Sequence, residues 1–187
     1  MKVWSVLLAL SFALLSGCLV TFKDPIPTSD TAPPKLLGTW TSKNAWGEPL
    51  ELEISRAGDK ANQYKAVSYR KGDRKNRDEY TFTVSRHGSR WYVSAALPEK
   101  YGANYVIAGF DLIDNESAAD ELVIYDLDVD RMQQLLDQKT FEGQTTETEK
   151  GNGVLITTSM DKVFAYLDDT ANSDVFLKAA QYQRMAK

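Results

Sequence analysis

The sequence is poor in histidine and cysteine, two residue types that catalysis and metal binding often use. His87 is the only histidine and Cys18 the only cysteine among 187 residues. A single histidine excludes metal sites built from several histidines and argues against a Ser-His-Asp arrangement. Its setting in Arg86-His87-Gly88-Ser89 predicts a solvated hairpin turn. The sequence holds no G-x-S-x-G, P-loop or H-E-x-x-H motif. We therefore expect a protein that is not an enzyme and that has no catalytic residue, no metal and no cofactor.

One group of carboxylates has a spacing used in calcium binding. Asp126, Asp128 and Asp130 alternate as the first ligands of a calcium loop do. Such a loop has Gly at position six and Glu at position twelve, whereas this sequence has Arg131 and Asp137 there. The apolar residues between the acids instead favour the end of a strand whose acidic face meets water.

The first eighteen residues have the pattern of a secretion signal. Lys2 supplies a positive start, and residues 6–15 form an apolar run of ten residues, too short to cross a hydrocarbon layer of ~30 Å. The run leads into Leu15-Ser16-Gly17-Cys18, which resembles the lipobox of bacterial lipoproteins. The resemblance implies that residues 1–17 are cleaved off and that Cys18 carries a diacylglycerol on its thiol, with further acylation of the new amine.

The lipobox resemblance also implies a location. Two or three acyl chains on one residue anchor a protein stably, whereas a single chain does so only marginally. In Gram-negative bacteria an Asp directly after the lipidated Cys favours inner-membrane retention, and this chain has Leu19 there. We therefore expect the inner leaflet of the outer membrane, facing the periplasm. A Gram-positive source would instead place the protein on the outer face of the cytoplasmic membrane.

The mature chain is mildly acidic and begins with a proline-rich segment. The net charge is −4, and removal of Lys2 makes it one unit more negative, which argues against nucleic acid as a partner. Residues 18–35 contain four of the six prolines and predict a tether that carries the lipidated Cys. The alternative is that this segment packs on the domain through Phe22 and Ile26. With a tether, a chain starting at Lys35 should fold by itself.

Residues 36–187 have the length of one domain and begin with period-two alternation of apolar and polar residues. Short connections between such segments predict a mainly β fold. We expect an antiparallel meander of about eight strands that closes, or nearly closes, into a barrel. The predicted strands are residues 36–42, 49–55, 63–70, 79–85, 90–96, 105–113, 121–128 and 153–158.

The C-terminal third interrupts this rhythm with helical spacing. Apolar residues recur at helical intervals in residues 129–139, and Ser159 is placed to cap a second helix over residues 159–168. Residues 172–187 are ambiguous between helix and strand. We expect a short helical turn followed by a closing strand.

Gly38-Thr39-Trp40, at the start of the first predicted strand, is similar to the Gly-x-Trp signature of lipocalins and related calycin barrels. The resemblance implies that Trp40 plugs one end of an eight-stranded barrel beside an Arg of the last strand, a part that Arg184 could play. A helix after the seventh strand departs from the lipocalin pattern. The alternative is an ordinary core Trp at a strand start.

Two surfaces could bind a partner. One is a basic segment between two predicted strands, which could contact anionic envelope material or could be a solvated hairpin loop. The other is a tyrosine-containing loop, a plausible barrel mouth or simply rim packing. The residues are Arg70, Lys71, Arg74, Lys75 and Arg77 for the first, and Tyr101 and Tyr105 for the second.

These observations lead to three functional hypotheses. The first is a non-enzymatic envelope lipoprotein whose barrel binds a protein partner or a small apolar ligand. The second is a structural or assembly factor of the outer membrane that acts through its surface. The third is a hydrolase acting on envelope polymers, which would need only two carboxylates across a cleft. Small inward side chains would favour a ligand cavity, and large ones a filled barrel.

Overall fold

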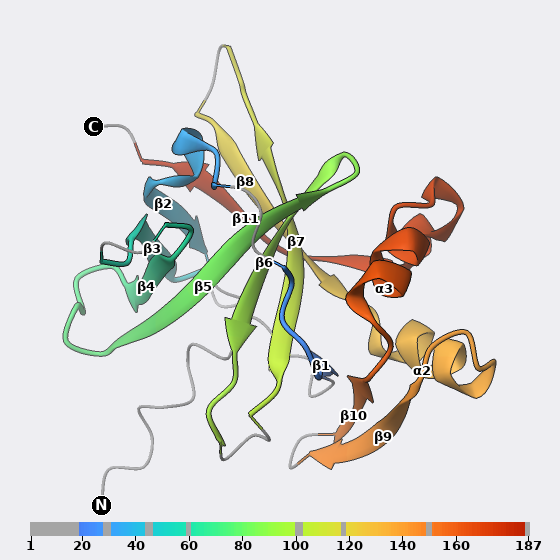
Figure 1. Ribbon diagram of the computed structural model, residues 1–187. Helices are drawn as coiled ribbons and strands as arrows, with labels where there is room; N and C mark the ends of the chain where they lie inside the picture. Colours follow the sequence, from blue (N-terminus) through green and yellow to red (C-terminus); the bar gives the residue numbers. More distant parts are fainter. Residues whose placement is uncertain are drawn as a thin grey trace, which may run out of the picture.

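The computed structural model describes residues 19–27, 31–43, 47–58, 61–99, 103–116, 119–148 and 151–185. These residues are mainly β, with strands joined in one continuous sheet (Figure 1). Eight strands close on themselves as an antiparallel barrel, which confirms the predicted fold class. They are β2 (Gly38–Lys43), β3 (Pro49–Arg56), β4 (Tyr64–Arg70), β5 (Arg77–His87), β6 (Arg90–Ala96), β7 (Tyr105–Ile113), β8 (Glu121–Leu127) and β11 (Phe176–Arg184).

The barrel has the meander connectivity that the alternation predicted. Each strand from β2 to β7 pairs antiparallel with the next along the chain. Strand β11 then lies between β8 and β2, and its pairs Gln183–Thr41 and Arg184–Trp40 close the ring. The expected closing strand at the end of the chain is therefore confirmed.

An insertion separates β8 from β11 and lies outside the barrel. It contains α2 (Val129–Asp137), β9 (Gly143–Thr148), β10 (Gly151–Ile156), α3 (Met160–Leu167) and a 3-10 segment η3 (Thr170–Val175). Asp128 caps α2 by accepting hydrogen bonds from two backbone amides. Ser159 occupies the cap position of α3, but its side chain makes no capping hydrogen bond.

One predicted barrel strand has a different place in the structure. Residues 153–158 were expected to belong to the barrel, yet β10 pairs with β9 and β1 in the insertion. Val154 and Ile156 are each 1 % exposed, so the apolar pattern of this strand is real. It faces a second core, which the alternation alone could not distinguish from the barrel interior.

The tether prediction is wrong for the described residues before the barrel. Residues Val20–Phe22 form β1, which pairs parallel with β10 and meets β7 at Tyr105. Phe22 and Ile26 are 1 % and 2 % exposed, as the alternative predicted. Apolar side chains thus hold this segment to the domain, although its prolines exclude regular structure from most of it. A 3-10 helix η1 (Pro34–Leu36) then leads into β2.

Two apolar cores result from this arrangement. The first lies inside the barrel and includes Trp40, Tyr64 and Phe110. The second lies on the outer face of β6 and β7, where Tyr92 and Ile107 pack under the insertion and β1. Within the described ranges, none of the helices has the length and apolar character needed to span a bilayer.

Candidate functional site

Trp40 closes one end of the barrel. Its side chain is fully buried, and its indole N–H donates to the carbonyl of Leu36 in η1 at 3.0 Å. The guanidinium carbon of Arg184 lies 4.2 Å from the centroid of the Trp40 ring system. Arg184 also donates to the carbonyls of Leu37, at 3.1 Å, and of Lys35. We call this arrangement the closed end.

Gly38 makes the closed end possible. Its φ of +128° is a conformation that residues with a Cβ rarely adopt. A Cβ at this position would lie 2.9 Å from the guanidinium of Arg184. Glycine therefore allows the last strand's cation to approach the Trp40 ring. The structure thus places all three residues named by the Gly-x-Trp resemblance, Gly38, Trp40 and Arg184, in one cluster.

The other half of the barrel interior has a different lining. Since neighbouring strands alternate in direction, β6 and β8 end, and β7 and β11 begin, at the end opposite η1. Strand register places small apolar side chains inward there, through the pairs Ala95–Val106 and Val93–Ala108 and the position of Ala180 opposite Ile124. We call this region the open half; its lining residues are Asp78, Tyr80, Ala95, Val106, Ala108, Asp126 and Ala180.

Four inward side chains of the open half keep part of their surface exposed. Ala95, Val106, Ala108 and Ala180 are only half-buried although they face the inside of a closed barrel. By contrast, Trp40, Tyr64 and Phe110 toward the closed end are at most 2 % exposed. The inward side chains are thus small and partly exposed toward one end of the barrel, and the largest buried ones lie toward the end that Trp40 closes.

Polar groups also line the open half. Asp126 faces inward two residues after Ile124, and burial raises the pKa of its carboxyl to about 6. The Asp126 carboxyl has no hydrogen-bond or ion-pair partner among the described residues. The Tyr80 hydroxyl is buried, again with no partner in the described part of the chain, and its pKa is raised mainly by burial. Asp128 caps α2 instead, so the alternating acids do not converge on one site.

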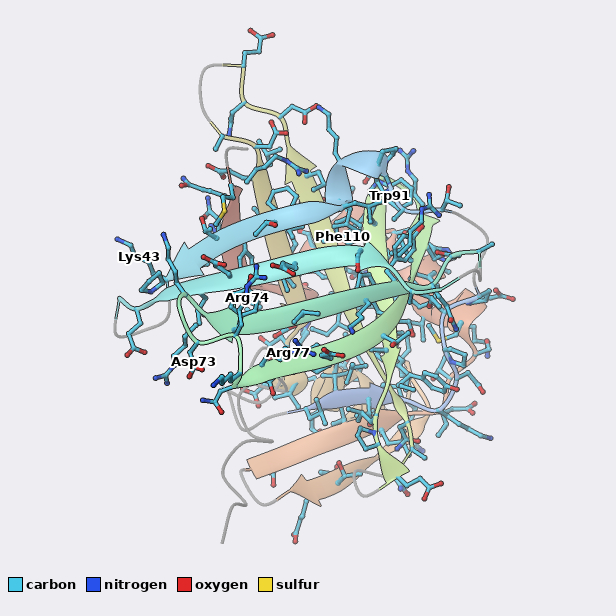
Figure 2. The ribbon with its side chains drawn as sticks, turned by 90° about the vertical axis from the view of Figure 1, so that its left-hand side faces the viewer. Lys43, Asp73, Arg74, Arg77, Trp91 and Phe110 are labelled. Atoms are coloured by element: carbon cyan, nitrogen blue, oxygen red, sulfur yellow. The ribbon has the colours of Figure 1, made fainter. Side chains whose placement is uncertain are left out.

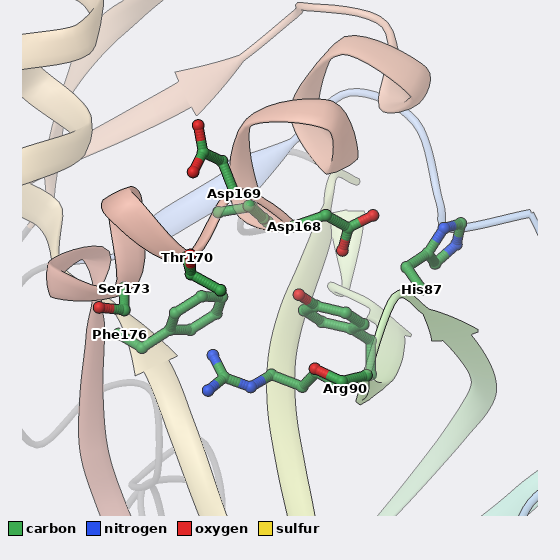
Figure 3. Close-up of a pocket in the computed structure, with 10 residues that line it drawn as sticks. His87, Arg90, Asp168, Asp169, Thr170, Ser173 and Phe176 are labelled. Carbon is green, nitrogen blue, oxygen red and sulfur yellow. The ribbon is translucent and has the colours of Figure 1, made fainter.

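A separate cleft of about 200 Å³ lies outside the barrel, between the β5–β6 hairpin and the segment from α3 to β11 (Figure 3). His87 is part of its wall, and the prediction of a solvated turn histidine is wrong. It is the last residue of β5, half-buried, and its ring stacks on Phe164 with 3.6 Å between centroids. Packing of α3 on the hairpin, which local sequence does not reveal, covers this side chain.

Ser85, His87 and Asp168 occupy this region without forming an activated nucleophile. Ser85 is 1 % exposed, and its hydroxyl donates to the carbonyl of Pro27 at 3.1 Å. The same hydroxyl lies 3.3 Å from Nε2 of His87. Its oxygen is buried and bonded to the backbone of the segment that precedes the barrel.

Arg90 is the cation of the outer cleft. Gly109 gives it room to cross β7, since a Cβ on Gly109 would lie 2.9 Å from Arg90 Cδ. The guanidinium carbon then lies 3.9 Å from the ring centroid of Phe176 and 5.1 Å from that of Tyr125. Figure 3 shows the side chain extended toward Phe176. The cation is thus held against ring faces, and no ion pair joins it to another described residue.

The predicted basic surface is largely neutralised by its own neighbours. Arg70 pairs with Glu48 at 3.6 Å, and Arg77 with Glu79 at 2.9 Å. Arg74 pairs with Glu53 and donates to the Tyr69 hydroxyl at 2.8 Å. In Figure 2, Arg74, in the β4–β5 turn, and Arg77, at the start of β5, lie toward one end of the barrel strands, and Trp91 and Phe110 lie toward the other. The basic loop therefore borders the open half, and Lys71 and Lys75 are its exposed cations with no ion pair to another described residue.

No family model, curated protein or solved structure matches this chain. The fold and the side chains themselves therefore carry the functional argument.

Two of the predicted site residues have no described position. Cys18 and Tyr101 lie outside the described residues. Tyr105 begins β7 and pairs with Phe22 and Ala96, so the structure makes it part of the sheet as well as of the mouth. Sequence reasoning missed the open half, because it did not follow the alternation from Phe110 back to the small residues of β7. A period-two reading of β7 could have marked Val106 and Ala108 as inward neighbours of Phe110.

Proposed function

We propose that this chain is an envelope lipoprotein, attached through lipidated Cys18 to the periplasmic face of the outer membrane. Its barrel binds a small, mainly apolar ligand without catalysing a reaction. The signal, the lipobox resemblance and the single cysteine support the anchor. The cluster of Gly38, Trp40 and Arg184 supports a lipocalin-like arrangement of the barrel.

The half-buried inward alanines of the open half carry the binding proposal. Small apolar walls inside a barrel of this size leave room that a ligand can fill, whereas large inward residues would fill it themselves. The large residues here gather at the closed end. The ligand would therefore enter from the end opposite η1 and stop at the layer formed by Phe110 and Tyr182.

The polar groups of the open half suggest a ligand with one polar end. A buried hydroxyl without a partner costs about 1–3 kcal/mol, which a ligand's hydrogen bond would recover. Tyr80 offers such a hydroxyl, and Asp126 offers a carboxyl that is protonated more readily than usual. An apolar body against the alanines and a polar group at Tyr80 or Asp126 would satisfy both.

Fluorescence with a neutral apolar probe tests this binding. We expect N-phenyl-1-naphthylamine to increase in emission with a soluble form that begins at Leu19, and to accept energy from Trp91 in the barrel wall. Ala108→Leu fills the open half and should weaken binding at least tenfold. Thr81→Leu adds the same side chain on the exposed outer face of β5 and should leave binding unchanged. Wild-type affinity in Ala108→Leu would contradict an interior site.

The outer cleft favours a second candidate, an assembly factor that binds a protein partner through its surface. Arg90, held against Phe176 and Tyr125, presents a cation on an aromatic platform, a combination common at protein interfaces. If Ala108→Leu leaves probe binding unchanged while Arg90→Ala removes a co-purifying envelope protein, this candidate replaces the first.

A further inference from the structure

Strand β1 is firmly fixed in the sheet at the point where the described chain begins. The Val154 amide donates to the Leu19 carbonyl at 2.9 Å, and the Lys23 amide to the Ile156 carbonyl at 3.0 Å. Val20 and Phe22 are 8 % and 1 % exposed. Release of β1 would therefore expose two core side chains and break backbone hydrogen bonds on both sides of the strand.

This attachment leaves almost no spacer after Cys18. Consecutive Cα atoms are ~3.8 Å apart, so the Cα of Cys18 lies within roughly 8 Å of that of Val20. Acyl chains on Cys18 would hold that residue at the level of the lipid headgroups. We infer that the barrel domain rests directly on the bilayer, with the surface around the start of β1 against the headgroups. This rests on the proposed lipidation of Cys18.

The contacting surface contains a second cleft, of about 230 Å³, between the start of α2 and strands β9 and β10. Val154 lines this cleft and also bonds to Leu19, so the cleft lies beside the anchor. Its other lining groups include Asp130, Gln133 and Asn152. These polar side chains suit the hydrated headgroup layer and would lose their water among acyl chains. The partner of this surface is thus the headgroup layer of a lipid bilayer.

Quenching by labelled lipid measures this contact in the full-length acylated protein. Lipidation consumes the only native thiol, so one introduced cysteine takes a single NBD fluorophore. Asn152→Cys places it at the inferred contact. Glu116→Cys places it three residues after the end of β7, a strand that meets β1 at its first residue, Tyr105, and runs away from it. The proteins are reconstituted in phosphatidylcholine vesicles that contain a headgroup spin-labelled lipid.

We expect quenching at position 152 to exceed that at position 116 at least threefold. Twelve Gly/Ser residues inserted between Cys18 and Leu19 should lower the quenching at position 152 toward that at position 116. Equal quenching at the two positions, in protein whose mass shows the acyl groups, would overturn the inference and leave the anchor standing. A mass without acyl groups would overturn both.

Discussion

At the scale of single residues, the closed end depends on one contact between the first and last barrel strands. The guanidinium of Arg184 in β11 lies over the Trp40 ring, and the indole N–H of Trp40 donates to Leu36 in η1. Strands β2 and β11 and the helix η1 therefore meet at this side chain. Gly38 supplies the space. Gly38, Trp40 and Arg184 are the residues to which the Gly-x-Trp resemblance pointed.

Trp40→Ala should therefore strongly destabilise the fold. Truncation of a buried Trp costs about 3–5 kcal/mol, a large share of the ~5–15 kcal/mol that a domain has. Urea unfolding monitored by circular dichroism would measure this loss. Leu177→Ala is the matched control, because Leu177 is 50 % exposed and should shift the midpoint little. Similar small shifts for both variants would show that the closed end contributes little.

Asp126 predicts a pH dependence of stability. Its folded-state pKa of about 6 lies above the ordinary value of 3.8, so the folded state favours the protonated form. The protonated carboxyl therefore favours the folded state fully below about pH 4, and this contribution to the free energy of unfolding is lost as the pH rises through about 6. Asp126→Asn, which is always neutral, should gain about 1–2 kcal/mol at pH 7.5, after allowance for partial exposure, and almost nothing at pH 4.

Urea midpoints of Asp126→Asn and wild type at pH 4, 5, 6 and 7.5 would test this dependence. Glu99→Gln, at an exposed position after β6, is the control and should behave like the wild type. The explanation fails if the difference between Asp126→Asn and wild type is the same at every pH.

At the scale of elements, alternation located the barrel strands because each has one face in the core and one in water. Strand β9, with the sequence GQTTET, gives no such signal, and β1 has only three residues in a proline-rich setting. Strand β10 was found but assigned to the wrong sheet region, since Val154 and Ile156 would look the same in either core. The candidate site shows the same difference. A short motif pointed to the closed end, whereas no motif marks the small inward residues of the open half.

Strand β1 should be needed for stability, contrary to the tether expectation. A chain that starts at Lys35 lacks Val20, Phe22 and Ile26 and leaves the edge of β10 unpaired. We expect it to unfold at a clearly lower temperature than a chain that starts at Leu19, or to aggregate through that edge. Phe22→Ala in the longer chain should cost about 3 kcal/mol or more. Equal melting temperatures for the two chains would show that residues 19–34 add nothing to stability and would support the expectation of a tether.

At the scale of the whole molecule, the proposed location depends on one residue, Cys18. Cys18→Ser removes the only thiol that can take lipid, so it should abolish membrane association and leave an uncleaved precursor. Metabolic labelling with a fatty-acid analogue, combined with electrophoresis and fractionation, would show label in the wild type alone. Label on the Cys18→Ser protein would mean that another residue is acylated.

The closing pair between Trp40 and Arg184 has a kinetic consequence. Strand β11 comes after every other barrel strand along the chain, and the whole insertion separates it from β8. Loop closure over such a separation is slow compared with hairpin formation. Until β11 pairs with both of them, β2 and β8 are the unpaired edges of an open sheet. Folding should therefore finish only after β11 docks, and under the proposed export to the periplasm the chain would be most open to proteases and chaperones during that interval.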